Sequence, residues 1–103
     1  MASIQIAHSA KLDFKEIFDY VSRQSLQNAE LLISAIKNGV QILEKYPEIG
    51  HIVKEINDPS FRELKIYKYR VIYFFQEEQV SIITIHHSSR LLKNNPHLKD
   101  FFE

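Results

Sequence analysis

Cysteine is absent from this sequence, and glycine and proline are scarce, with two and three residues. Without cysteine, the chain can form neither a disulfide framework nor a thiolate metal site, and a reducing compartment is compatible with it. Two glycines cannot supply a glycine-rich phosphate loop. These absences argue against a disulfide-stabilised secreted domain and against nucleotide hydrolysis.

Long apolar runs are also absent, since no stretch approaches the roughly 20 residues that a membrane-spanning helix needs. The N-terminal residues Met1–Gln5 do not combine a basic stretch with a following apolar one, as a secretory signal would. We therefore expect a cytoplasmic protein that has no membrane segment.

An excess of one charge sign is missing too, because 13 lysines and arginines balance 13 aspartates and glutamates. The chain as a whole has no field that would attract nucleic acid, so any anion site must come from a local patch. Residues 60–74 concentrate four cations against the single acid Glu63. The cations are Arg62, Lys65, Lys68 and Arg70. This patch indicates either an anion-binding or nucleic-acid-binding surface or the solvated rim of a sheet.

The 103 residues, 45% of them hydrophobic, are enough to bury one core, so we expect a single domain over residues 1–103. The alternation in residues 3–7 predicts a short strand with Ile4 and Ile6 on one side. An apolar stripe at intervals of three and four residues follows, and it predicts an amphipathic helix over residues 10–23 with Ser9 as its N-cap. The stripe consists of Phe14, Ile17, Phe18 and Val21.

A second apolar stripe begins after Ser25 and predicts a long helix. This helix must end by Tyr46, because Pro47 disfavours helical geometry in the residue before it. The stripe consists of Ala29, Leu32, Ile33, Ile36, Val40 and Leu43. Because the link between the two helices is short, they are expected to form an antiparallel hairpin.

The pattern changes from helical to alternating after a turn at residues 47–50, where β-branched and aromatic residues accumulate. It predicts a short strand and then a meander of three longer ones, at residues 52–56, 61–66, 69–76 and 79–87. Asn95 and Pro96 would then start a terminal helical turn that holds Leu98, Phe101 and Phe102. The sequence thus predicts an α+β fold, with an N-terminal strand and a helical hairpin packed on one face of a mainly antiparallel sheet.

Two tight turns set the predicted register of the three long strands. A turn at residues 67–68 places Lys65 opposite Arg70. A turn at residues 77–78 pairs Ile72 with Ile83 and Arg70 with Ile85, which leaves His87 diagonal to Arg70. The predicted sheet then has two unlike faces.

One predicted face collects eight apolar side chains and should receive both helices. They are Leu64, Ile66, Tyr69, Val71, Tyr73, Phe75, Val80 and Ile82. The other face carries an apolar end, with Ile72, Phe74, Ile83 and Ile85, and a cationic end, with Lys65, Arg70 and His87. Like charges directly opposite on a sheet repel, which favours a bound phosphate or carboxylate at the cationic end. Alternatively, Glu63 on the same face already pairs with one of these cations.

The adjacent histidines His86 and His87 point to opposite sides of a strand and cannot hold one metal ion together. We therefore expect no metal and no cofactor. RNA cleavage without a metal needs cations for the phosphate and a general acid or base. Arg70, Arg90 and Lys65 could serve the phosphate, and His87 could move the proton. The alternative is that His87 is a strand-end histidine bound by its neighbours.

An ordered series of short motifs along nearly the whole chain resembles the RelE/ParE superfamily of plasmid-stabilisation toxins. The series is Ser9-Ala10, Asp13, Ile17, Tyr20, Pro47, Gly50, Arg62-Glu63-Leu64, Tyr69-Arg70-Val71-Ile72-Tyr73, Ile85-His86-His87 and Arg90. The resemblance implies the toxin of a type II toxin–antitoxin system, with an antitoxin encoded beside it that wraps and neutralises it. The family often has glycine where this chain has Tyr67, and a left-handed tyrosine would be strained.

The resemblance leaves two activities open. In the RelE-like branch, ribosome-dependent cleavage of mRNA would use Arg70, which matches the arginine of the family's YR motif, together with His87 and Arg90. In the ParE-like branch, the toxin acts on DNA gyrase and lacks the full nuclease set. The Arg62-Glu63-Leu64 motif and the lack of any tyrosine after Tyr73 favour the ParE-like branch. A degenerate domain of the same fold without toxicity is the second alternative.

Overall fold

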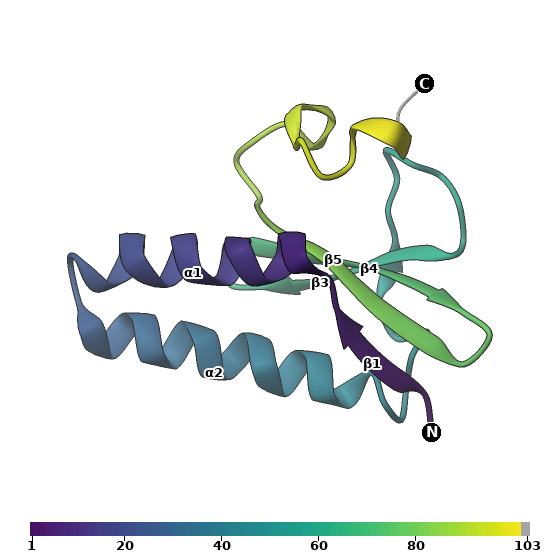
Figure 1. The fold of residues 1–103 in the computed structure, drawn as a ribbon, viewed down its shortest axis with the longest axis horizontal. Helices are drawn as coiled ribbons and strands as arrows, with labels where there is room; N and C mark the ends of the chain where they lie inside the picture. Colours follow the sequence, from purple (N-terminus) through teal and green to yellow (C-terminus); the bar gives the residue numbers. More distant parts are fainter. Residues whose placement is uncertain (102–103) are drawn as a thin grey trace.

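Two helices pack against one face of a five-stranded sheet in the computed structural model, which describes residues 1–101 (Figure 1). The elements are β1 (Ser3–Ile6), α1 (His8–Ser22), α2 (Leu26–Ile42), β2 (His51–Ile52), β3 (Phe61–Ile66), β4 (Tyr69–Gln76), β5 (Gln79–His87) and two short 3-10 turns, η1 (Leu92–Asn94) and η2 (Lys99–Phe101). The predicted α+β fold is confirmed, and Phe102 lies outside the described residues. Within residues 1–101, no helix is long and apolar enough to cross a membrane.

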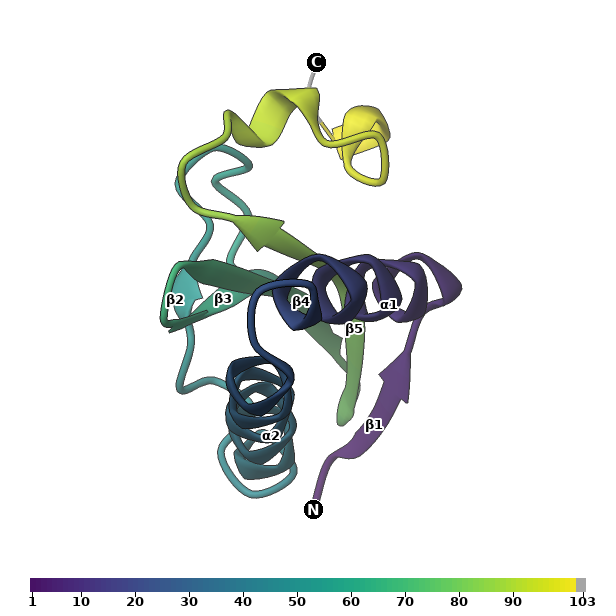
Figure 2. The same ribbon diagram turned by 90° about the vertical axis from the view of Figure 1, so that its left-hand side faces the viewer.

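The sheet has the strand order β1-β5-β4-β3-β2, and its centre is the predicted antiparallel meander (Figure 2). β1 pairs with β5 in parallel, from Ser3 opposite Gln79 to Ile6 opposite Ile82. The turn after β3 keeps the predicted pairing of Lys65 with Arg70, with Tyr67 in the left-handed region at φ 54°.

The helix limits follow local side-chain chemistry. The second helix begins after Ser25 as predicted, and Ser25 caps it, because its Oγ accepts the backbone N–H of Asn28 at 3.1 Å. The prediction that Ser9 caps the first helix is wrong, since α1 begins at His8 and the hydroxyl of Ser9 instead donates to the carbonyl of Ile83 at 2.5 Å. The predicted strand at residues 52–56 is also wrong beyond Ile52, because the chain turns there.

A β-bulge in β5 overturns the predicted register at the far end of the sheet. Tyr73 pairs with Ile82, but Ile72 pairs with Thr84, so Ile83 is an extra residue in the strand. Arg70 therefore lies opposite His86, and the predicted pairs Ile72 with Ile83 and Arg70 with Ile85 are wrong. The residues of β5 beyond the bulge point to the face opposite to the one predicted, because side chains alternate along a strand.

The core is divided between the two faces of the sheet. All eight side chains predicted for the helix-covered face pack there, and Ile85 joins them because of the bulge. The second face buries Ile72 together with Phe61 and Val53 under the C-terminal turns. Leu92 and Leu98 complete this second cluster, so the segment after β5 is a cover for the sheet.

Two close contacts position α2 and the turn at residues 47–50 against the strands of the meander. A Cβ on Gly39 would lie 2.7 Å from Cδ1 of Ile66, so a larger residue there would require the end of the Ile66 side chain to move. The phenol of Tyr73 donates to the carbonyl of Pro47 at 2.8 Å and accepts the N–H of Gly50 at 3.0 Å. Burial raises the pKa of Tyr73, which keeps this phenol protonated as a donor.

Candidate functional site

Arg70 is held by two carboxylates on the second face of the sheet. Its Nε and Nη2 donate to Glu63 at 2.7 and 2.6 Å, and Nη1 and Nη2 donate to Glu55 at 2.9 Å each. The side chain of Arg70 is 12% exposed and that of Glu63 only 5%. The hydrogen bonds that Arg70 donates to Glu63 and Glu55 raise the pKa of Arg70, and the same donation holds the pKa of Glu55 below its usual range. The pairing of Glu63 with a cation, foreseen as the alternative, is the arrangement found.

The other predicted cations do not gather around Arg70. Arg62 donates to the carbonyls of Pro59, Glu48 and Gly50 at 3.0–3.2 Å, so it ties the preceding turns to β3. Lys65 and Lys68 are exposed, and neither forms an ion pair with any residue in 1–101. The predicted patch is therefore two engaged arginines and two solvated lysines.

Arg70 and His87 lie on opposite faces of the sheet, so the predicted single site containing both is wrong. Beyond the bulge, His87 pairs with Tyr69 on the helix-covered side, and their rings meet edge to face at 5.2 Å. His86 takes the place beside Arg70. The two histidines do point apart, and no three acidic or histidine side chains in the described part of the chain are placed to hold a metal ion.

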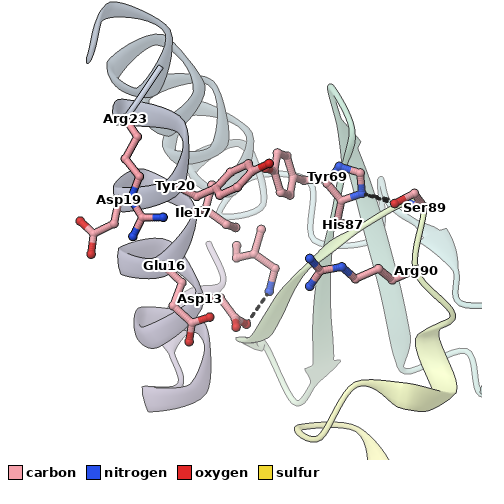
Figure 3. A pocket seen from close by; sticks show the side chains of 11 residues that line it. Asp13, Glu16, Ile17, Asp19, Tyr20, Arg23, Tyr69, His87, Ser89 and Arg90 are labelled. Atoms are coloured by element: carbon pink, nitrogen blue, oxygen red, sulfur yellow. Dashed lines mark hydrogen bonds between the residues drawn. The ribbon is translucent and has the colours of Figure 1, made fainter. Parts of the chain in front are cut away.

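His87 and Arg90 instead line a groove of about 630 Å³ between α1 and the end of the sheet (Figure 3). The wall from α1 consists of Asp13, Glu16, Ile17, Asp19, Tyr20 and Arg23. The sheet side consists of Tyr69, Ile85, His87, Ser89 and Arg90. Sequence reasoning missed Arg23 and Ser89 as partners of the predicted residues. The three- and four-residue spacing of Asp13, Glu16, Tyr20 and Arg23 on one helix face was the available signal.

The ring of His87 is oriented by Ser89. Its Nδ1 accepts the backbone N–H of Ser89 at 3.1 Å and lies 2.7 Å from the Ser89 hydroxyl. A backbone N–H can only donate, so the neutral ring carries its proton on Nε2. His87 thus presents one N–H donor, at Nε2, that has no acceptor within residues 1–101. Burial raises the pKa of the neighbouring Tyr69, which remains a neutral phenol.

Beyond the end of β1, the side chains of Asp13 and Ser9 form the hydrogen bonds with β5 that a neighbouring strand would otherwise form. β1 ends at Ile6, and beyond it Oδ2 of Asp13 accepts the N–H of Ile85 at 3.0 Å and the hydroxyl of Thr84 at 2.5 Å. Asp13 and Ser9 are four residues apart and therefore share one face of α1. This contact places α1 beside the groove and satisfies the free edge at the bulge.

A buried polar network anchors the chain that carries Arg90. Oγ1 of Thr84 accepts Nδ2 of Asn95 at 3.2 Å, and Nδ2 also lies 3.0 Å from Nδ1 of His86. Nε2 of His86 lies 3.0 Å from the carbonyl of Arg90, to which it donates. Oδ1 of Asn95 accepts the N–H of His97 at 2.9 Å, in agreement with the predicted terminal turn. The backbone of Arg90 is thereby fixed at the edge of the groove.

The groove carries both charge signs. Asp13, Glu16 and Asp19 supply three carboxylates, and Arg23 and Arg90 supply two guanidinium groups. Within residues 1–101, neither of these arginines forms an ion pair. Arg90 extends from the sheet side toward α1, and Tyr20 reaches toward Tyr69 (Figure 3). The arrangement can bind an anionic group next to a cationic one.

Solved structures with the same fold include a chain of a toxin–antitoxin system and a toxin. The chromosomal ParDE toxin–antitoxin system from P. aeruginosa has a chain with a TM-score of 0.69 at 20% identity, covering 84% of this chain and 96% of that one. A copper-bound mutant toxin from Helicobacter pylori has a TM-score of 0.61 at 19% identity, covering 89% of this chain and 100% of that one. At these identities the likeness establishes the fold.

The family is established by sequence. A family described as the ParE toxin of the type II toxin–antitoxin system parDE matches residues 4–92, and the chain belongs to this family. A search among curated proteins found no relative that matches.

Proposed function

We propose that this ParE-family chain is a cytoplasmic toxin that acts by binding a protein target, with DNA gyrase as the first candidate, and that a cognate antitoxin neutralises it. The chain would act as one domain over residues 1–103. The observation that carries the proposal is the position of Arg70. This arginine is bound by Glu55 and Glu63 on the face opposite His87 and Arg90, so a nuclease site built from all three is not assembled.

The balance of charge supports a protein target over RNA. The chain has equal numbers of cationic and acidic residues, and the groove has three carboxylates beside two guanidinium groups. Affinity for nucleic acid depends mainly on cations that neutralise phosphates. A protein surface of mixed charge does not require such an excess.

The test is titrated expression of the full chain in a bacterium, with and without the product of a short neighbouring gene. Growth arrest that the neighbour relieves is expected. The purified chain should then inhibit gyrase supercoiling, and cells should accumulate double-strand DNA breaks. Growth arrest without either gyrase effect would overturn gyrase as the target.

Ribosome-dependent cleavage of mRNA is the second candidate, because the free Nε2–H of His87 lies in one groove with Arg90 and could donate a proton to a leaving oxygen. This reading predicts mRNA cut at codon-spaced positions, lost in His87→Ala and Arg90→Ala. It also predicts that any effect of Arg70→Ala follows from stability. The absence of growth arrest would favour the third possibility, a domain that has kept the fold without toxicity.

A further inference from the structure

The protein has two separate exposed surfaces of different chemistry. Leu31 and Ile42, eleven residues apart on one face of α2, are 58% and 49% exposed, and Tyr46 beyond them is 58% exposed. A shallow hollow of about 320 Å³ lies beside Ile42 and Tyr46 and shares no residue with the groove. Stable interfaces are the more apolar ones, whereas transient interfaces are more polar. The groove therefore suits a transient partner, and the apolar surface of α2 suits a stable one.

The groups of the groove are divided by charge between its two sides. Glu16 places its carboxylate on the α1 wall, whereas the carboxylate of Asp19, three residues further on, points away from the sheet (Figure 3). Arg90 extends toward this wall from the sheet side, and the rings of Tyr20 and Tyr69 lie between α1 and His87 (Figure 3). Arg23, one turn after Asp19, adds a second cation at the end of the wall. A ligand that satisfies all of these groups must itself carry both a carboxylate and a cation.

Tyrosine and arginine add a second reason to expect a protein partner. Tyr20 is 63% exposed at the rim, next to Tyr69 and within the same groove as Arg23 and Arg90. Tyrosine and arginine are enriched among the residues that dominate protein–protein affinity. Neither arginine has an ion-pair partner in residues 1–101, so their donors are available to a ligand.

We infer that this groove is the surface with which the toxin binds its protein target, through a target segment that bears an acidic and a basic side chain close together. The acidic side chain lies against Arg90, and the basic one lies against Glu16. The inference rests on the proposed function and specifies the site and chemistry of the contact. The target segment is therefore recognised by charge pattern, which favours fast association and specificity.

The test compares two charge reversals of opposite sign, Arg90→Glu and Glu16→Lys, in titrated expression of the full chain. Each should raise the intracellular toxin level needed for half-maximal growth arrest by about tenfold, as the loss of one interfacial charge contact would. The matched controls are Lys54→Glu and Glu30→Lys, which reverse exposed charges outside the groove and should leave this level unchanged. Binding of each purified variant to the antitoxin reports that the fold is intact.

Glu16→Lys separates a protein target from RNA, because it makes the groove more positive. Stronger toxicity of Glu16→Lys would point to a polyanion and overturn the inference. Unchanged toxicity of both groove variants would overturn it too, and so would loss of antitoxin binding with toxicity retained. If the wild-type chain arrests no growth, the proposed function fails and the inference fails with it. If the wild-type chain is toxic and both groove variants are equally toxic, the inference about the groove fails while the proposed function stands.

Discussion

Arg70 binds two carboxylates in this fold, and one of them, Glu63, is nearly completely buried. A buried carboxylate that loses its cation is strongly destabilising, because its desolvation is no longer compensated. The same residue that the family resemblance assigns to phosphate binding therefore holds the loop that carries Glu55 against β3 and β4. At this position, loss of activity on mutation would not by itself identify a catalytic group.

We expect Arg70→Ala to lower the free energy of unfolding by about 3–5 kcal/mol, since it leaves Glu63 buried without a partner. Urea denaturation of the purified chain measures this change. Lys65→Ala, on the exposed position opposite Arg70, is the control and should change stability by less than about 0.5 kcal/mol. An Arg70→Ala variant as stable as the wild type would show that the ion cluster contributes nothing to the fold.

The contact between Glu55 and Arg70 should make the free energy of unfolding depend on pH in the acidic range. Arg70 lowers the pKa of Glu55 below its ordinary value of 4.5, so the unfolded chain binds this proton more readily than the folded chain. The contact therefore contributes its full stabilisation at a pH above 4.5, the ordinary pKa of this carboxyl. The stabilisation is lost as the pH falls through the lower pKa that Glu55 has in the folded chain. Urea midpoints between about pH 6 and pH 3 should fall less steeply for Glu55→Gln than for the wild type. Parallel curves would contradict this linkage.

At the scale of elements, the hairpin between β4 and β5 is joined by a strained turn. Glu77 and Glu78 adopt φ of 52° and 62°, the left-handed conformation that a two-residue hairpin turn requires and that Asn-Gly adopts most easily. Replacing Glu77-Glu78 by Asn-Gly should stabilise the chain by about 1–2 kcal/mol, measured by thermal and urea unfolding. Gln-Gln at the same positions removes the charges but keeps the strain, so an equal gain from it would assign the effect to charge.

The link between α1 and the edge of β5 depends on one carboxylate. Asp13→Ala removes the acceptor for the N–H of Ile85 and for the hydroxyl of Thr84, and we expect a loss of about 1–3 kcal/mol in urea unfolding. Asp19→Ala, on an exposed position of the same helix, is the matched control. Equal stability of the two variants would show that the strand edge is satisfied without Asp13.

Periodicity predicted the helices, the meander and the eight core residues of its helix-covered face, because burial imposes a fixed spacing on each type of element. It could not reveal the bulge. A regular alternation places Ile83 and Ile85 together on the second face, and no glycine or proline in residues 82–86 marks the extra residue that turns Ile85 under the helices. The groove escaped prediction because its two walls come from elements far apart in the sequence, joined through Asp13 at the strand edge.

At the scale of the whole molecule, charge balance predicts weak interaction with nucleic acid. With 13 cationic and 13 acidic residues, the chain should show no binding to a single-stranded RNA oligonucleotide at protein concentrations up to about 100 µM at physiological salt. Fluorescence anisotropy measures this. Binding in the submicromolar range that weakens steeply with added salt would contradict the prediction and favour the ribonuclease activity.

The extra residue at Ile83 has a consequence for how relatives of this chain are compared. A chain one codon shorter at the bulge would keep His87 toward α1 and His86 beside Arg70, because the ladder beyond the bulge would be unchanged. A chain that instead lacks one residue between Thr84 and His86, with the bulge retained, would exchange the two histidines: His87 would lie beside Arg70, and His86 would point toward α1. Equivalent histidines at this strand end are therefore identified by their partners across the ladder, and a position-by-position alignment can match residues that face opposite ways.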